Sequence, residues 1–225
     1  MKYVSFIPLR SGSKGLPNKN ILSLRGKELY MYSVEQSLRT SQKCFISTDI
    51  ESILFREFDQ DVEVFKRPQE LAGDEIVMKD VILDFLKRIS INNLSIILLQ
   101  ATSPLRLDED IENCKRLFNK GDYSMVMSLS TKNKVSSKFG FISDEKFLPF
   151  SNQFLFKNRQ QIPEVYGPNG AIYIFRAKDF MQKRTFPYDQ IGAYLMPKER
   201  SLDIDSLEDF KLVEKQLIQK QRNSI

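Results

Sequence analysis

Three cations and two glycines lie in the short stretch 10–19, directly after the apolar segment 3–7, which is expected to form the first strand. Glycines allow backbone N–H groups to approach a polyphosphate closely, and Arg10, Lys14 and Lys19 supply positive charge. The order Ser-Lys-Gly differs from the Walker pattern, in which Gly-Lys is followed by Ser or Thr. The stretch therefore predicts either a phosphate-binding loop at the carboxyl end of a strand or a solvated basic turn.

Asp203 and Asp205 form a second group with chemical potential, near the end of the chain. Alternate side chains of an extended segment point to one face, so the two carboxylates are expected to lie together. Such a pair before a helix suits a hard divalent cation such as Mg²⁺. The alternative is that Asp205 belongs to the start of the helix and that Asp203 is simply exposed. Together with the basic loop, the pair describes a phosphate–metal–carboxylate arrangement of the kind used in nucleotidyl transfer.

Polar side chains also follow the most apolar predicted strand, 95–99. Gln100, Thr102 and Ser103 would lie at the same edge of the sheet as the basic loop, unless they only begin the next helix. Further along the chain, Arg159 precedes two glutamines and could donate to a carboxylate or a phosphate; the alternative is a solvated loop arginine.

The composition excludes several kinds of chemistry. The 225 residues include no histidine, which rules out Ser–His and Cys–His nucleophiles, histidine-ligated metals and histidine bases. Proton removal must then use a carboxylate, a metal-bound hydroxide or water. The formal charge of +5 suits small anionic ligands and is compatible with nucleic acid, although no run of five or more Lys and Arg exists.

We expect a cytoplasmic protein. Cys44 and Cys114 lack the CxxC spacing and are interpreted as reduced, structural thiols. The sequence begins with a strand pattern rather than a signal peptide, and its apolar runs are too short to span a membrane.

Apolar periodicity predicts the elements that position these groups. Strands are expected over 3–7, 44–49, 62–65, 95–99, 123–129, 171–175 and 191–196, and helices over 28–38, 50–58, 74–89, 108–119 and 206–219. Asp49 is expected to cap the second helix, and 166–170 to form a turn. The alternation of strands and helices predicts one α/β domain over 1–225, with a Rossmann-like, mostly parallel, doubly wound sheet.

The segment 130–163 breaks this alternation and is expected to leave the sheet as a hairpin or loop. Its six phenylalanines either pack on the parent domain or form an interface with a partner chain. They are Phe139, Phe141, Phe147, Phe150, Phe154 and Phe156.

Four motifs, in order along the chain, together resemble the CMP-sialic acid synthetases, the acylneuraminate cytidylyltransferases. They are the loop 10–20, the segment 99–106, Pro168-Asn169-Gly170 with its continuation to 173, and Asp203-Ile204-Asp205. The segments 47–49 and 67–74 add to the resemblance. It implies a dimeric, Mg²⁺-dependent nucleotidyltransferase that joins CTP to an acidic nine-carbon sugar. The anomeric hydroxyl would attack the α-phosphorus in line and release pyrophosphate.

The resemblance also implies roles for individual residues. The catalytic positions that hold the triphosphate are Arg10, Lys14 and Lys19, and the rest of the nucleotide site comprises Ser11, Gly12, Ser13, Asn20 and Arg67. The sugar-binding positions are Gln100, Lys138, Arg159, Asn169 and Tyr173, and the metal ligands are Asp203 and Asp205. Lys138 corresponds to a lysine lent by the second subunit, so 130–163 would be the dimerisation element.

Two departures from the family pattern concern the sugar. Gly167 stands where many members have arginine, and Ile76-Val77-Met78 replaces a segment that is often small and hydroxylated. N-acetylneuraminate, legionaminate and pseudaminate are the candidate substrates. The nearest rival is an enzyme for the eight-carbon acid Kdo, whose first loop has a different pattern. A rival of another class is a non-catalytic nucleic-acid binder, for which the sequence lacks aromatic–basic motifs.

Overall fold

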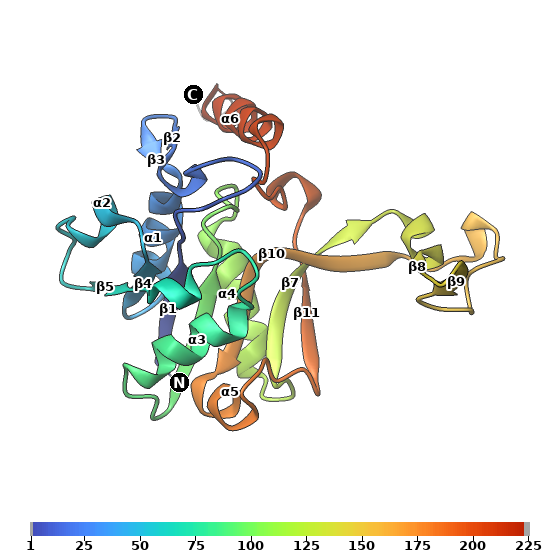
Figure 1. The fold of residues 1–225 in the computed structure, drawn as a ribbon, viewed down its shortest axis with the longest axis horizontal. Helices are drawn as coiled ribbons and strands as arrows, with labels where there is room; N and C mark the ends of the chain where they lie inside the picture. The colour runs from blue at the N-terminus through green and yellow to red at the C-terminus, as the bar shows by residue number, and fades with distance from the viewer. Residues whose placement is uncertain (1, 223–225) are drawn as a thin grey trace.

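The computed structural model describes residues 2–222. Within that range, a seven-stranded sheet forms the centre of the molecule, in the order β11-β7-β10-β6-β1-β4-β5 (Figure 1). Its strands are β1 (Lys2–Pro8), β4 (Cys44–Thr48), β5 (Val62–Lys66), β6 (Leu94–Leu99), β7 (Met125–Lys132), β10 (Val165–Arg176) and β11 (Ile191–Leu195). Strand β10 runs antiparallel to β6 and β7, whereas the other neighbouring pairs are parallel. The predicted mostly parallel sheet is confirmed.

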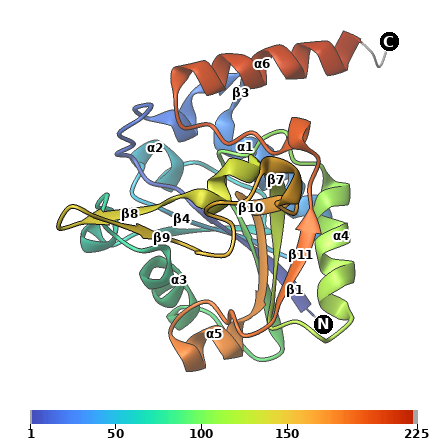
Figure 2. The same cartoon turned by 90° about the vertical axis from the view of Figure 1, so that its right-hand side faces the viewer.

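Helices cover both faces of this sheet, as a doubly wound fold requires. The helices are α1 (Leu29–Thr40), α2 (Glu51–Leu54), α3 (Met78–Lys87), α4 (Asp108–Asn119), α5 (Ala177–Lys183) and α6 (Leu207–Arg222). Figure 2 shows α3 and α5 on one side of the sheet and α4 on the other. None of the helices in the described range is long and apolar enough to cross a membrane.

Shorter elements complete the fold. They are the hairpin strands β2 (Ser23–Leu24) and β3 (Lys27–Glu28), the strands β8 (Gly140–Ser143) and β9 (Lys146–Pro149), and the 3₁₀ turns Lys19–Ile21, Gln69–Leu71, Lys134–Lys138, Arg159–Gln161 and Lys198–Arg200.

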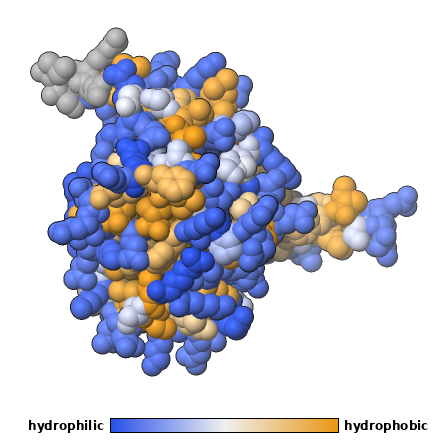
Figure 3. Space-filling model, turned by 60° about the vertical axis from the view of Figure 1, so that its left-hand side comes forward, coloured by the Kyte–Doolittle hydropathy of each residue, from blue (hydrophilic) through white to orange (hydrophobic). Residues whose placement is uncertain are grey.

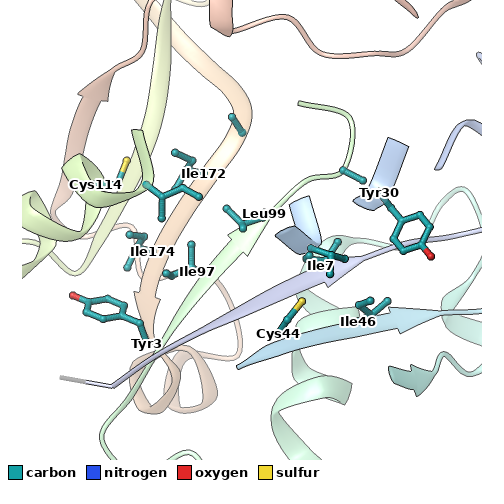
Figure 4. Close-up of a cluster of buried hydrophobic side chains, with 14 of the residues drawn as sticks. Tyr3, Ile7, Tyr30, Cys44, Ile46, Ile97, Leu99, Cys114, Ile172 and Ile174 are labelled. Atoms are coloured by element: carbon teal, nitrogen blue, oxygen red, sulfur yellow. The ribbon is translucent and has the colours of Figure 1, made fainter. Parts of the chain in front are cut away.

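The period-two alternation of β1 explains why the sheet needs cover on both faces. Tyr3 and Ile7 join the core beneath α1 and α4, whereas Val4 and Phe6 join the core beneath α3 and α5. Figure 4 shows Ile7 among buried side chains from β4, β6 and β10. Cys44 and Cys114 are buried free thiols in the same cluster, as expected for structural cysteines.

Three predicted elements differ from the structure. In place of the helix expected over 50–58, the structure has a single turn, Glu51–Leu54, in which Ile53 is the buried residue. The helix expected from 74 begins at Met78. The turn expected at 166–170 instead lies within β10, whose pairing with β7 shifts register between Pro168 and Tyr173. Helix α5 was not predicted.

The segment 130–163 extends away from the body as an arm (Figure 1). Its first residues continue β7, its tip contains the β8–β9 hairpin, and β10 returns from it. Packing of all six phenylalanines on the parent domain is wrong, since five are largely exposed: Phe139, Phe141, Phe147, Phe150 and Phe156. Figure 3 shows the resulting hydrophobic surface on the projecting arm. The partner interface stays a prediction.

Candidate active site

The basic loop after β1 and the acidic pair before α6 meet at one cavity of about 180 Å³. The cavity lies beyond the carboxyl ends of β1 and β6, which is where open α/β sheets bind ligands. It is lined by Pro8, Arg10, Lys19, Asn20, Arg67, Met78, Gln100, Ala101, Thr102, Asp203 and Asp205. Residues almost 200 positions apart in the sequence therefore share one site, and seven of the predicted site residues line it.

A second cavity, of about 560 Å³, lies at the opposite edge of the sheet. Its lining includes Lys2, Ser95, Arg176 and Lys178, and none of the predicted site residues. Seven of the predicted site residues thus gather at the other edge, and we place the candidate active site there.

Two residues of the loop fix it to the acidic segment. The Lys19 ammonium donates to the carbonyl oxygen of Ile204 at 2.8 Å and to Asp205 Oδ1 at 2.7 Å. A Cβ atom at Gly15 would lie 2.2 Å from the carbonyl oxygen of Asp205. Glycine is therefore required at this position by the close approach of two backbones.

Asp49 holds the beginning of the loop. The Ser11 backbone N–H donates to Asp49 Oδ1 at 2.8 Å, and the Ser11 hydroxyl donates to Asp49 Oδ2 at 2.5 Å. The predicted capping role of Asp49 is wrong, since no side chain caps α2. Its position just after β4, the parallel neighbour of β1, is the sequence signal that could have placed it beside the loop.

Asp74 contacts the other two loop cations. The Arg10 guanidinium donates to Asp74 Oδ1, and the Lys14 ammonium lies 3.3 Å from Asp74 Oδ2. The hydrogen bond from Arg10 is the main cause that holds the pKa of Asp74 below its usual value. This contact was not predicted. Gly12 lies beneath the Arg10 side chain, and Asn20 anchors the same turn by donating to the Arg10 carbonyl oxygen at 3.0 Å.

Arg67 adds a buried positive charge to the lining of the cavity. Its side chain donates to the carbonyl oxygen of Ser47 at 3.0 Å, and the residue is only 4% exposed. Burial lowers the pKa of Arg67 to about 10, and the charge of Asp49 opposes this shift. The guanidinium therefore stays charged at neutral pH.

The two aspartates of the acidic pair have different environments. Asp203 is mostly buried, and its Oδ1 atom has no hydrogen-bond partner among residues 2–222. Burial raises the pKa of Asp203, which the neighbouring Thr102 side chain partly opposes. Asp205 is largely exposed. The alternative in which Asp203 is merely exposed is wrong, and Thr102 lies at the cavity rather than at the start of α4.

The predicted sugar positions Gln100, Asn169 and Tyr173 lie just after β6 and within β10, its antiparallel neighbour. Gln100 lines the cavity, and Gly170, at a φ of 78°, leaves room for the Gln100 amide, whose Oε1 atom would be 2.9 Å from a Cβ there. Tyr173 is half-buried, and burial together with the charge of Asp203 raises its pKa. Asn169, next to Gly170, is buried.

Asn169 makes its hydrogen bonds within the protein. Its Oδ1 accepts from the Ser128 hydroxyl at 2.6 Å, and its Nδ2 donates to the Ser201 hydroxyl at 3.0 Å. These bonds connect β7 and β10 to the segment that leads to Asp203. The structure thus gives Asn169 a role in positioning the acidic segment, and its contact with a sugar stays a prediction.

Arg106 is a buried residue that the sequence reasoning missed, although it ends the second motif. It is 1% exposed, and its guanidinium donates to Ala171 O at 2.6 Å, Gln100 O at 3.3 Å, Ser33 Oγ at 2.7 Å and Gln36 Oε1 at 3.0 Å. Burial lowers its pKa to about 10. It joins α1 to the middle of β10 and to Gln100, the cavity residue that directly follows β6.

The arm carries two predicted sugar-binding residues away from this cavity. Lys138 and Arg159 belong to its 3₁₀ turns, and neither lines the cavity of the same chain. Gly167 lies in β10 against the side chain of Lys132. Of Ile76, Val77 and Met78, which depart from the family pattern, only Met78 lines the cavity.

Comparison with known proteins gives consistent results. The sequence model of a family described as cytidylyltransferase matches residues 4–223. The N-acylneuraminate cytidylyltransferase of Streptococcus agalactiae serotype V is 35% identical over 93% of this chain, which spans 52% of that protein. The chain thus spans about half the length of the N-acylneuraminate cytidylyltransferases that it matches.

Two further proteins match over most of their own length. The CMP-N,N'-diacetyllegionaminic acid synthase of Campylobacter jejuni is 30% identical over 91% of this chain and 90% of that protein. The structure of CMP:2-keto-3-deoxy-manno-octonic acid synthetase complexed with CTP matches with a TM-score of 0.71, at 16% identity, over 98% of this chain and 100% of that one. The last comparison shows a shared fold.

Proposed function

The chain belongs to the cytidylyltransferase family, and from this premise we propose that it transfers the cytidylyl group of CTP to an acidic nine-carbon sugar of the sialic type. The products are a CMP-sugar and pyrophosphate. The observation that carries the proposal is the single cavity in which Arg10 and Lys19 face Asp203 and Asp205. Cations for a polyphosphate and carboxylates for a metal ion are the groups that this transfer uses.

The loop is proposed to stabilise the leaving group. The anomeric oxygen of the sugar forms a bond to the α-phosphorus of CTP, and the bond from that phosphorus to the bridging oxygen of pyrophosphate breaks. Negative charge then grows on the pyrophosphate, where Arg10, Lys14 and Lys19 supply positive charge and the backbone N–H groups around Gly12 supply donors. Because Asp49 and Asp205 already hold the loop in shape, little reorganisation is needed during the reaction.

Asn20 and Arg67 are proposed to hold the nucleoside. Both line the cavity and both are buried. A buried guanidinium gains most from a ligand that offers acceptor atoms, because water reaches it poorly. Cytosine and ribose both present such acceptors.

Asp203 and Asp205 are proposed to hold Mg²⁺. The fit is supported by Asp203 Oδ1, a buried carboxylate oxygen that no group in residues 2–222 satisfies. Two carboxylates leave most coordination positions to phosphate oxygens and water, which is how Mg²⁺ is commonly bound. When bound, the ion would add positive charge beside the phosphates. Since the sequence has no histidine, the same two carboxylates are the side chains lining the cavity that could accept a proton.

We further propose a homodimer in which the arm of one subunit completes the sugar site of the other. The exposed phenylalanines of the arm support this proposal, since aromatic residues are enriched in interfaces. Lys138 and Arg159 would then bring positive charge to the carboxylate of the acidic sugar. The single chain leaves both residues outside its own cavity.

Pyrophosphate release tests the proposed function. We expect release from CTP with one of N-acetylneuraminate, legionaminate or pseudaminate, and little with ATP, GTP or UTP. Release with Kdo alone would replace the sugar assignment. Binding to RNA or DNA that weakens steeply with salt, without any pyrophosphate release, would favour the non-catalytic alternative. The Asp203→Asn variant should lose the activity, whereas the control variant Glu208→Gln, on the exposed side of α6, should retain it.

A further inference from the structure

We propose that Asp74 is an internal substitute for phosphate: its carboxylate binds Arg10 and Lys14 in the empty site and is displaced by the triphosphate of CTP. The inference rests on the proposed function, because it assumes that the loop cations bind this triphosphate. Asp74 would then oppose nucleotide binding and help the loop to release pyrophosphate.

The Asp74 carboxylate contacts both Arg10 and Lys14. Its two carboxylate oxygens are divided between the two cations, with Oδ1 accepting from Arg10 and Oδ2 facing Lys14. Asp74 lies outside the loop, in the segment between the turn Gln69–Leu71 and α3, so it belongs to a different part of the chain from the cations it contacts. Its lowered pKa keeps the carboxylate anionic at neutral pH. A single anion thus neutralises two like charges that would otherwise repel each other in the empty loop.

The remaining loop contacts show which parts of the site can exchange partners. Ser11 is fixed by Asp49, and the Lys19 side chain is 14% exposed and bonded to the acidic segment. In contrast, the Lys14 side chain is 81% exposed, and Asp74 is the sole ion-pair partner of Arg10 and Lys14 within the described chain. Exposed ion pairs are weak and are easily replaced. The loop therefore combines a fixed frame with two cations that are free to change partners.

Asp74 lies where a triphosphate bound in the cavity could replace it on Arg10 and Lys14. Arg10 lines the cavity, and so does Met78, four residues after Asp74, so this segment lies at the margin of the site. A triphosphate carries more charge and more acceptor oxygens than one carboxylate, and it should win the competition for both cations. After transfer, Asp74 competes again with the departing pyrophosphate.

The test measures binding of inorganic tripolyphosphate, pyrophosphate and CTP by calorimetry at one ionic strength. We expect Asp74→Asn to bind tripolyphosphate and pyrophosphate roughly three- to tenfold more tightly than the wild-type protein, the range that two exposed ion pairs can supply. Asp74→Glu, which keeps the charge, should resemble the wild type. The adjacent Glu75→Gln makes the same charge change without contacting the loop cations and should alter affinity by less than about twofold.

Each result decides the matter. Unchanged or weaker tripolyphosphate binding by Asp74→Asn would overturn the inference, and weaker binding would show that Asp74 instead aligns Arg10 for the ligand. If that happens while the wild type still releases pyrophosphate from CTP, the proposed function stands. If the wild type binds neither CTP nor tripolyphosphate, both fail. Asp74→Ala serves as a second neutral variant should Asp74→Asn not fold, and thermal melting checks the fold of each.

Discussion

Replacing Gly15 by alanine tests whether the close approach of the loop and the acidic segment matters. The added Cβ would lie 2.2 Å from the carbonyl oxygen of Asp205 and 3.3 Å from its carbon atom, and real Cβ contacts essentially never fall below 3.0 Å. Since both partners are backbone, the two segments must separate by about 1 Å to reach an ordinary contact distance. That displacement would move the loop relative to Ile204 and Asp205, the two residues that Lys19 binds.

The expected cost can be estimated from this displacement. A misplacement of about 1 Å can reduce catalysis by about a hundredfold, which corresponds to roughly 2.7 kcal/mol of transition-state stabilisation. Gly15 itself is exposed, so we expect the free energy of unfolding to change by less than about 1 kcal/mol. The variant should therefore fold normally and lose activity.

The assay is kcat/KM for pyrophosphate release, measured beside a thermal melt. Gly73→Ala is the matched control, because a Cβ at Gly73 would meet only the Ile76 side chain, at 3.6 Å, and this is an ordinary contact. We expect the control to retain activity within about twofold. If Gly15→Ala retains activity within about threefold of the wild type, then the close approach of Gly15 to Asp205 does not position the basic loop against the acidic pair.

Three further predictions concern other parts of the site. Asp203→Asn should abolish activity and yet raise the melting temperature at pH 8. The pKa of Asp203 is raised in the folded protein, so ionising this carboxyl costs stability as the pH rises, and the asparagine removes that cost. The gain in melting temperature should fade as the pH falls toward the ordinary pKa of 3.8, and an equal or lower melting temperature at pH 8 would contradict this. Arg106→Met should lower the free energy of unfolding by roughly 3 kcal/mol in urea denaturation, since Gln100 O and Ala171 O lose a buried donor; a loss below about 1 kcal/mol would be inconsistent with it. Exchanging the exposed Phe141 and Phe147 for serine should give monomers in sedimentation with a raised KM for the sugar and an unaltered KM for CTP; an intact dimer would count against the proposed interface.

The sheet could be predicted because its signal is local. The continuous apolar runs of β1 and β6 indicate strands covered on both faces, and the structure confirms both. Strand β10 shows the limit. The glycines and proline of 166–170 are typical of a turn, but the chain uses them for an irregularity inside a long antiparallel strand. Which of these outcomes occurs depends on pairing with β7, and the local sequence does not contain that information.

In the candidate site, too, some residues could be identified from the sequence and others could not. The loop cations and the acidic pair could be identified from residue type and spacing, and their meeting follows from the rule that strand ends share one edge of a sheet. The partners of these groups could not. Asp49 resembled a helix cap, Asp74 resembled the start of a helix, and Arg106 became visible only through donors directed at three separate elements. Such contacts arise from tertiary packing over long sequence separations.

A crystal structure of the wild-type protein with CTP would test the central claim most directly. We expect the triphosphate to lie along the loop 10–19, with the α-phosphate facing Asp203 and the base beside Arg67. A triphosphate bound away from the loop, for example in the cavity beside Lys2 and Arg176 at the opposite edge of the sheet, would contradict it.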